Sequence, residues 1–497
     1  MRNLRRTQVP RKEVESQHMI RKGLPGGSFK PLSEESIRMV HQTAMRVIEE
    51  VGFEVNSGAA LELFKGAGAG VDQEKHRVYL SQKKAMEFIE MAPSEIRLCG
   101  QDEKNDIILG GNRVYTGTGG TALYVYHPDI GQRQLATLDD LKRIAKLVDG
   151  LDNIHLFLLP IYPSDLPFEQ IDVNRFFAGL DNTTKHIMGG VYTPDGVKQV
   201  IRMAEIIAGS AERLRQRPII SIIACTISPL KIDSQYGDVL VSIAKSGMPV
   251  ACPAEPLCGA TAPVTLAGNL VIQTVDSLIG IILTQIVNPG TPVIFGSVAT
   301  NTDLTSLKYL AGSVEMGLLN AAGAQMAQFY KLPFYATGGM TDSKVLDAQS
   351  GYESALTSLL CALAGANFIH DAAGLMDFAL TVCYEKYVTD NEILGMVMRA
   401  VEGITVNDDT LAFDLIKQVG PGGNFVAARH TRRFMRSEHY QPSLSDRESR
   451  DNWEAQGSKT TWRRAAEMVP RIIAEHNYSL PAAVRQQVLS EITGIVD

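Results

Sequence analysis

Polar and aromatic residues follow short apolar runs at several points of this sequence, where buried strands would end. They are tyrosines, glycines, thiols, hydroxyls and acids, without a cluster of arginine or lysine: Tyr115, Thr116, Tyr162, Gly189, Gly190, Tyr192, Cys225, Thr226, Glu255, Cys258, Ser297, Thr300, Gly338, Gly339, Met340, Asp342, His370 and Asp371. Several aromatic faces pointing into one opening could hold a quaternary ammonium group. The same tyrosines could instead serve packing alone.

Three ionisable residues stand out within this set or beside it. Glu255 follows the apolar run Val250 to Ala254, where a carboxylate is costly unless it is paired. It either forms a salt bridge to a neighbouring helix or serves a site. His186 and His370 are likewise either hydrogen-bonded core residues or members of the site. The pairs Gly189-Gly190 and Gly338-Gly339 either form turns or let a bulky ligand approach the backbone.

The sequence offers little support for a metal site. Cys252 and Cys258 lie six residues apart and His370 could approach them. Structural zinc usually takes closer ligand pairs, and catalytic zinc needs three converging ligands. The six cysteines show no CxxC spacing, which argues against a disulfide framework and favours a reducing cytoplasm. We therefore predict no metal ligands and a cytoplasmic protein.

A repeated strand–helix unit sets the spacing of these residues. Expected strands cover 114–119, 154–161, 186–191, 219–225, 250–254, 293–298, 334–338 and 368–372, and expected helices follow at 138–148, 168–180, 196–208, 234–246, 264–287, 307–328, 348–363 and beyond 376. Short apolar strands are typical of parallel sheets buried on both faces. Eight right-handed units predict an α/β protein with a (β/α)8 TIM barrel, whose site lies at the C-terminal strand ends. An open doubly wound sheet is the alternative.

Two regions flank the expected barrel of residues 109–419. Residues 1–108 combine a polar N-terminal arm, a helix that begins after Ser33 and ends at Gly52, and a small α/β extension. Residues 420–497 form a helical tail with an amphipathic segment at 462–476. We expect this tail to pack on the barrel or on a partner subunit.

Composition excludes several classes of function. The chain has 497 residues, of which 45% are hydrophobic and 21% charged, as in an ordinary folded protein. A net charge of −7 gives no reason to expect nucleic acid or an anionic membrane as partner. The most apolar window, 270–287, contains Asp276 and several polar side chains that are costly in lipid, so we predict a buried helix. Met1 to Lys12 is basic but lacks the apolar stretch of a signal peptide.

Three segments of the chain resemble the trimethylamine methyltransferase family. They are Tyr335-Ala-Thr-Gly-Gly-Met-Thr-Asp-Ser-Lys344 continuing to Asp347-Ala-Gln-Ser-Gly-Tyr-Glu353; the tail Gly420-Pro-Gly-Gly-Asn-Phe425 with His430, Thr431, Arg436, Glu438, Pro442, Leu444, Asp446 and Arg447; and the helix ending Glu49-Glu50-Val51-Gly52. The resemblance spans essentially the whole chain. It implies a barrel that passes a methyl group from a methylated amine to the Co(I) corrinoid of a separate protein.

The founding members of that family carry pyrrolysine in the loop that corresponds to Gly338-Gly339-Met340. Met340 stands at or beside that position here, and the chain therefore looks like the betaine methyltransferases of the family. These demethylate quaternary amines such as glycine betaine, proline betaine, carnitine or butyrobetaine. A quaternary ammonium leaves as a neutral amine, so the reaction needs no general acid.

The resemblance and the strand-end pattern together give a set of candidate site residues. We expect catalytic roles for Glu255 and Met340. We expect the aromatic rings of Tyr115, Tyr162 and Tyr352 to bind the substrate cation. The candidates for donating a hydrogen bond to the substrate carboxylate are His186, Gln349 and His370. No cofactor is expected to bind tightly, and the corrinoid protein and further copies of the chain are the expected partners. The alternatives are a zinc-dependent methylcorrinoid:thiol methyltransferase and a non-catalytic betaine-binding subunit.

Overall fold

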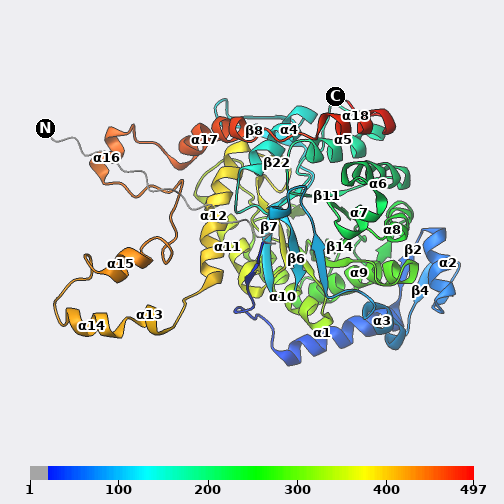
Figure 1. Cartoon of the computed structure of the whole chain (residues 1–497). Coiled ribbons are helices and arrows are strands. Elements are labelled where there is room, and N and C mark those ends of the chain that lie inside the picture. The colour runs from blue at the N-terminus through cyan, green and yellow to red at the C-terminus, as the bar shows by residue number, and fades with distance from the viewer. Residues whose placement is uncertain (1–20, 497) are drawn as a thin grey trace.

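The computed structural model describes residues 21–496, and eight parallel strands form its centre (Figure 1). Their order in the sheet is β7 (Arg113–Thr118), β10 (Leu156–Leu158), β11 (His186–Gly190), β12 (Ile220–Ile223), β14 (Val250–Ala254), β16 (Val293–Ser297), β19 (Phe334–Thr337) and β20 (Phe368–Ala373). β20 pairs in parallel with β7 and so closes the barrel. The predicted (β/α)8 barrel is confirmed, and the open sheet is wrong.

A long helix follows each barrel strand and covers its outer face. These helices are α4 (Leu138–Asp149), α5 (Phe168–Leu180), α6 (Pro194–Ala208), α8 (Ser234–Ser246), α9 (Leu266–Val287), α10 (Val314–Tyr330), α11 (Ala348–Ala364) and α12 (Tyr384–Glu402). Side-chain caps fix most of their starts. Thr137, for example, forms a capping box with Asp140 at the start of α4.

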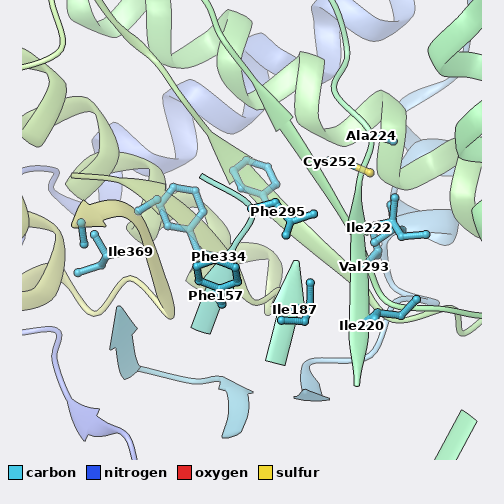
Figure 2. Packing of buried hydrophobic residues seen from close by; sticks show 14 of the residues in the cluster. Phe157, Ile187, Ile220, Ile222, Ala224, Cys252, Val293, Phe295, Phe334 and Ile369 are labelled. Atoms are coloured by element: carbon cyan, nitrogen blue, oxygen red, sulfur yellow. The ribbon is translucent and has the colours of Figure 1, made fainter. Parts of the chain in front are cut away.

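Strand side chains alternate between two apolar layers. Ile220, Ile222, Val293 and Phe295 point outward and pack in the layer between the strands and the helices (Figure 2). Neighbouring residues of the same strands, such as Ile294, point inward and join a separate cluster in the barrel interior. This alternation determines which strand residues can reach a site inside the barrel.

A two-stranded hairpin packs against the interior cluster. It consists of β5 (Glu95–Leu98) and β6 (Ile107–Gly110), and its residues Ile96, Leu98, Ile107 and Leu109 contact the inward-pointing residues of the barrel. The hairpin chain runs directly into the start of β7. It therefore fills the N-terminal end of the barrel with apolar side chains.

Two small sheets are built from segments that follow the C-terminal ends of barrel strands. One contains β15 (Leu257–Cys258), β17 (Thr300–Asp303) and β18 (Lys308–Tyr309); the other contains β21 (Leu375–Met376), β22 (Thr381–Val382), β8 (Tyr124–His127) and β9 (Gln132–Leu135). The expected helix start at 307 is therefore wrong. Asp303 accepts hydrogen bonds from Thr305 N and Ser306 Oγ, which forms a hairpin turn, and the helix begins only after its cap Ser313.

The N-terminal region packs on the outside of the barrel. Its strand β1 (Leu24–Pro25) pairs with β7, and its helix α1 (Glu34–Arg46) continues as a π-helical turn, η1 (Val47–Val51), to Gly52 as expected. The rest comprises β2 (Phe53–Val55), α2 (Gly58–Gly66), β3 (Gly70–Asp72), β4 (Arg77–Tyr79) and α3 (Gln82–Ile89), with β13 (Lys231–Ile232) completing its sheet. Most of the expected N-terminal arm lies outside the described residues.

The C-terminal region leaves the barrel and returns to it. After α12 it forms α13 (Asp408–Leu411), α14 (Phe413–Val419) and α15 (Arg429–Phe434), which project away from the barrel in Figure 1 and contain no buried residue. We call residues 404–435 the C-terminal arm. After α16 (Arg450–Ala455), the chain returns as α17 (Thr461–Glu475) and α18 (Ala482–Glu491), which pack on α4, α12 and α6.

Among the described residues, α9 alone is long and apolar enough to cross a membrane. Most of it is buried inside the protein, where it packs against α1, α3 and α8. The expectation of a buried helix at 270–287 is confirmed.

Candidate active site

A cavity of about 430 Å³ lies at the C-terminal ends of the barrel strands. The inward-pointing residues Leu158, Ile223, Val298 and Tyr335 form its apolar floor. Its walls come from the loops after the strands: Gly120, Thr121, Gly190, Tyr192, Cys225, Pro253, Glu255, Tyr309, Met340, His370, Asp371, Phe378, Ala379 and Leu380, together with Arg175 and Tyr236 from helices. Three of the predicted site residues, Glu255, Met340 and His370, meet in this cavity.

Glu255 faces the cavity from the end of β14. Its carboxylate forms no ion pair or hydrogen bond with any residue in the range 21–496, and its side chain is exposed where it lines the cavity. Burial, and in second place the negative charge of Asp371, raise the pKa of Glu255 to about 7. The alternative of a salt bridge to a neighbouring helix is therefore wrong.

Asp371 sits in an unusual backbone conformation at the end of β20. Its φ of 59° lies in the left-handed region, and the register of β20 against β7 shifts between Ile369 and Ala373. The carboxylate accepts a hydrogen bond from Gly120 N at 3.0 Å, and its other oxygen lies 3.0 Å from His370 Nδ1. The irregular strand end thus turns a second acid toward the cavity.

His370 is held by a hydrogen bond through Nε2 and by stacking of its ring, whereas its Nδ1 forms no hydrogen bond with any described residue. Thr337 Oγ1 donates its single proton to the Ser297 carbonyl at 2.9 Å, so His370 Nε2, 2.5 Å from the same hydroxyl, must be the donor to it. The ring also stacks on Tyr335, with centroids 3.8 Å apart and planes inclined by 21°. His370 is therefore fixed in orientation, with one nitrogen against Asp371.

Aromatic side chains surround the two acids. Tyr309 comes from β18, and burial, followed by the charges of Glu255 and Asp371, raises its pKa well above the usual value. Tyr236 reaches the cavity from α8, and burial raises its pKa to about 12. Both phenols stay neutral, so their rings retain an uncharged electron-rich face.

Arg175 is a cavity residue that the sequence did not reveal. It lies on α5 and exposes only 1% of its surface, yet it is one of the residues that line the cavity. Nε and Nη2 donate to the carbonyls of Ile161 and Leu159 at 3.1 and 3.0 Å. No carboxylate within the described residues forms an ion pair with it.

Tyr115 and His186, which we expected to bind substrate, are not among the residues that line the cavity. Tyr115 lies in the N-terminal half of β7, and its hydroxyl exchanges hydrogen bonds with Arg21 O and Gly23 N. His186 opens β11, where its nitrogens contact Cys99 O at 2.9 Å and Ser221 Oγ at 2.8 Å. Both residues point inward, but at the end of the barrel that the β5–β6 hairpin fills.

Tyr162, Gln349 and Tyr352 also lie outside the residues that line the cavity. Tyr162 packs edge-on against the cavity residue Tyr192, with ring centroids 5.9 Å apart. Gln349 donates to Glu353 Oε1 on the same helix, and Tyr352 on α11 is 61% exposed at the outer surface. Helix α11 follows β19 closely in sequence but turns these side chains away from the barrel mouth.

The loop that carries Met340 is rigidly held. Gly339 has a φ of 102°, and a Cβ there would lie 2.5 Å from Ala372 Cα, so this position needs glycine. Glu353 accepts hydrogen bonds from Thr341 Oγ1 at 2.5 Å and from Asp342 N at 2.8 Å. Met340 itself is almost fully buried and contributes an apolar part of the cavity wall.

No group of three histidine, cysteine, aspartate or glutamate side chains within residues 21–496 has the arrangement of a metal site. Cys225 lines the cavity, but burial and the charge of Glu255 raise its pKa to about 12. Burial likewise raises the pKa of Cys252 to about 12. Both thiols are therefore protonated at neutral pH and are poor nucleophiles.

The closed barrel with an acidic, aromatic cavity at the C-terminal strand ends defines a TIM-barrel enzyme. The sequence profile of the trimethylamine methyltransferase (MTTB) family matches residues 1–493. The chain therefore belongs to this family and is a methyltransferase, as its motifs predicted.

Individual relatives are similar over nearly their full length. A trimethylamine methyltransferase MttB of Desulfitobacterium hafniense is 37% identical over 94% of this chain and 93% of its own. A glycine betaine methyltransferase of the same species is 35% identical over 91% of this chain and 93% of its own. The crystal structure of the Methanosarcina barkeri monomethylamine methyltransferase covers 89% of this chain and 92% of its own, with 10% identity and a TM-score of 0.46.

Proposed function

We propose that this protein transfers an N-methyl group from a quaternary amine, such as a betaine, to the Co(I) corrinoid of a partner protein. The observation that carries the proposal is the unpaired carboxylate of Glu255 beside Asp371 and the rings of Tyr309 and Tyr335. A fixed positive charge complements such a cavity both through the carboxylates and through the aromatic faces. One relative is named a glycine betaine methyltransferase, which supports the same substrate class.

Methyl transfer from a quaternary amine requires the chain to bind and orient the substrate but not to supply a proton. One C–N bond of the ammonium breaks, its electron pair stays on nitrogen, and Co(I) supplies the pair for the new Co–CH3 bond. The amine leaves without a charge, so no proton has to be delivered. The protein binds the cation, turns one methyl group toward the mouth and excludes water, and orientation supplies most of the acceleration.

Glu255 bears on the choice between tertiary and quaternary amines. With a pKa of about 7, it could keep a proton on a tertiary amine in the cavity. The acid alone therefore does not separate trimethylamine from a quaternary amine. Met340 disfavours tertiary amines as substrates, because its thioether has no electrophilic ring that could capture and orient a small amine.

We infer that the chain assembles with further copies of itself. The C-terminal arm carries the exposed apolar side chains Ile404, Val406, Phe413 and Val426, of which Val426 is 80% exposed. The arm is fixed to the barrel at both ends, through α12 and through Glu392, which accepts hydrogen bonds from Ser443 and Ser445. Apolar segments that no part of their own chain covers mark interaction sites.

The unpaired cysteines fit a reducing cytoplasm.

A transfer assay with free Co(I) cobalamin tests the proposed function. Glycine betaine with deuterated methyl groups should give deuteromethyl cobalamin and dimethylglycine, both measured by mass spectrometry. The purified protein itself should carry no stoichiometric cobalt or zinc. Binding of betaines without any turnover would establish the non-catalytic alternative, and metal-dependent methylation of a thiol from methylcobalamin would establish the zinc alternative.

A further inference from the structure

Arg175 lacks the partner that a buried cation normally has. Three of its nitrogens make contacts: two donate to backbone carbonyls, and Nη1 lies 3.5 Å from Tyr192 Oη, at the limit of a hydrogen bond. A guanidinium has five N–H donors, so part of this donor capacity stays free at the cavity wall. Leaving a buried charge without a counter-charge is costly.

Asp172, the acid nearest in sequence, interacts with Arg175 but does not pair with it: burial raises the pKa of Asp172 to about 6, and the charge of Arg175 opposes that rise. Asp172 lies one helical turn before Arg175, and its Oδ2 accepts the backbone N–H of Tyr192 at 3.0 Å. Its Oδ1 has no hydrogen-bond partner, and no ion pair within 4.0 Å joins it to Arg175. The guanidinium therefore remains available to an anion that enters the cavity.

The charges of the cavity are separated around the barrel. Arg175 bonds to the loop after β10, and Tyr192 follows β11. Glu255 follows β14, and Asp371 lies in the C-terminal half of β20, so both acids belong to the half of the barrel formed by β14 to β20. The cavity thus has the positive charge of Arg175 in one part of its wall and the acids Glu255 and Asp371 in other parts. This arrangement complements a substrate that carries one positive and one negative charge.

We propose that Arg175 binds a carboxylate of the substrate, so that the substrate is a zwitterion with its ammonium group toward Glu255 and its carboxylate toward Arg175. This inference rests on the proposed function and adds to it the residue that selects betaines among quaternary amines. A guanidinium suits a carboxylate because it can donate two parallel hydrogen bonds. Arg175 thus takes the role that the sequence predicted for His186 or Gln349, which the structure places outside the cavity.

The wild-type protein gives the first test. Glycine betaine, its methyl ester, its amide and choline share one trimethylammonium head but differ in the carboxylate. A site built for a charged group rejects analogues that lack it, and we expect a preference for glycine betaine of at least about 100-fold in kcat/KM. A preference below about threefold would overturn the role of Arg175.

Variants give the second test. Arg175→Gln should lower kcat/KM for glycine betaine at least about 100-fold, mainly by raising KM, and so remove the preference over the ester. Arg175→Lys should restore part of the preference. Arg202→Gln on α6, an exposed arginine paired with Glu491, is the matched control and should change neither value. A folded Arg175→Gln protein that keeps the preference would show that Arg175 only supports the loop after β10.

Further measurements separate the possible failures. If Arg175→Gln does not fold, Tyr192→Phe and the analogue series on the wild-type protein still test the role of Arg175. Loss of the Tyr192 hydroxyl should lower the preference for glycine betaine over its ester two- to tenfold. Calorimetric titration measures the same preference as binding, independently of turnover. Absence of methyl transfer with selective binding of glycine betaine would refute the proposed function and leave the role of Arg175 standing.

Discussion

Asp371 lies close enough to Glu255 for its negative charge to add to the larger effect of burial and raise the pKa of Glu255 to about 7. The two acids come from the ends of β20 and β14 and line the same cavity. Without substrate, Glu255 is therefore about half protonated at neutral pH. A bound cation would favour its ionised form.

This relationship predicts a pH dependence of substrate capture. Because the ionised Glu255 attracts the ammonium group, kcat/KM for glycine betaine should fall as the pH drops below about 7. Glu255→Gln should lower kcat/KM about 10- to 100-fold at pH 8, or about 1.4–2.7 kcal/mol, and flatten the profile. A pH profile of both proteins with free Co(I) cobalamin checks this, and an unchanged profile in the variant would assign the titration to another group.

The same carboxyl should reduce the stability of the fold. Its pKa rises from an ordinary 4.5 to about 7 on folding, so the folded protein holds the proton more tightly than the unfolded chain. Ionisation then destabilises the fold progressively as the pH rises from about 4.5 to about 7. Glu255→Gln should therefore have a higher Tm than the wild type at pH 8, with a smaller difference at pH 5. Thermal unfolding at both pH values measures it, and a lower Tm of the variant at pH 8 would contradict the expectation.

A substitution at Gly190 should alter the cavity and leave the packing of the core unchanged. A Cβ built there meets no atom within 4 Å, so a side chain would extend into the cavity itself. Gly190→Val should raise KM for betaines at least about 10-fold while the free energy of unfolding changes by less than about 1 kcal/mol. Gly351→Ala on α11 is the control, since its Cβ also meets nothing but lies outside the cavity lining. Unchanged KM in Gly190→Val would mean that the substrate binds elsewhere.

Substrate panels should separate quaternary from tertiary amines. We expect methylation of Co(I) cobalamin from at least one betaine and no rate above background from trimethylamine, because trimethylamine has no carboxylate for Arg175 and Met340 offers no adduct-forming ring. The loss of Co(I) absorbance gives the rates. Comparable rates with trimethylamine would refute the quaternary-amine assignment.

The C-terminal arm should be needed for assembly but not for folding of the barrel. Phe413 and Val426 are 70% and 80% exposed and belong to no apolar core cluster formed by residues 21–496. Replacing both with glutamate should reduce the mass measured by light scattering after gel filtration and leave the Tm of dilute protein within about 2 °C of the wild type. An unchanged mass would show that another surface joins the copies.

The regular part of the fold could be predicted because each unit repeats one pattern. Short apolar runs alternate with amphipathic or apolar helices, and the barrel strands and helices from 113 to 402 lie within a few residues of their expected places. The short strands that follow the barrel strands were not predicted, and among them the hairpin of β17 and β18 displaces an expected helix start. Its turn depends on the side chain of Asp303, and Leu307 in it adopts a φ of 55°, which the apolar pattern does not reveal.

The cavity could be predicted only where a residue follows its strand directly. Glu255 meets that condition and is found there, and His370 lies inside β20 but also lines the cavity, whereas Tyr115 and His186 lie toward the opposite ends of their strands. Arg175 and Tyr309 were missed because one reaches the cavity from a helix and the other from the unexpected hairpin. An arginine directly before the apolar run Phe176-Phe177-Ala178 of α5 is the signal that could have indicated the first.

The β5–β6 hairpin, which fills the N-terminal end of the barrel, also determines the order of events during turnover. Since apolar side chains occupy the interior below the cavity, the amine and the methyl acceptor must use the same opening at the strand ends. An acceptor as large as a protein covers that opening when it docks. The amine must therefore bind first and its demethylated product must leave last, so steady-state kinetics should follow a compulsory-order pattern with the amine as leading substrate.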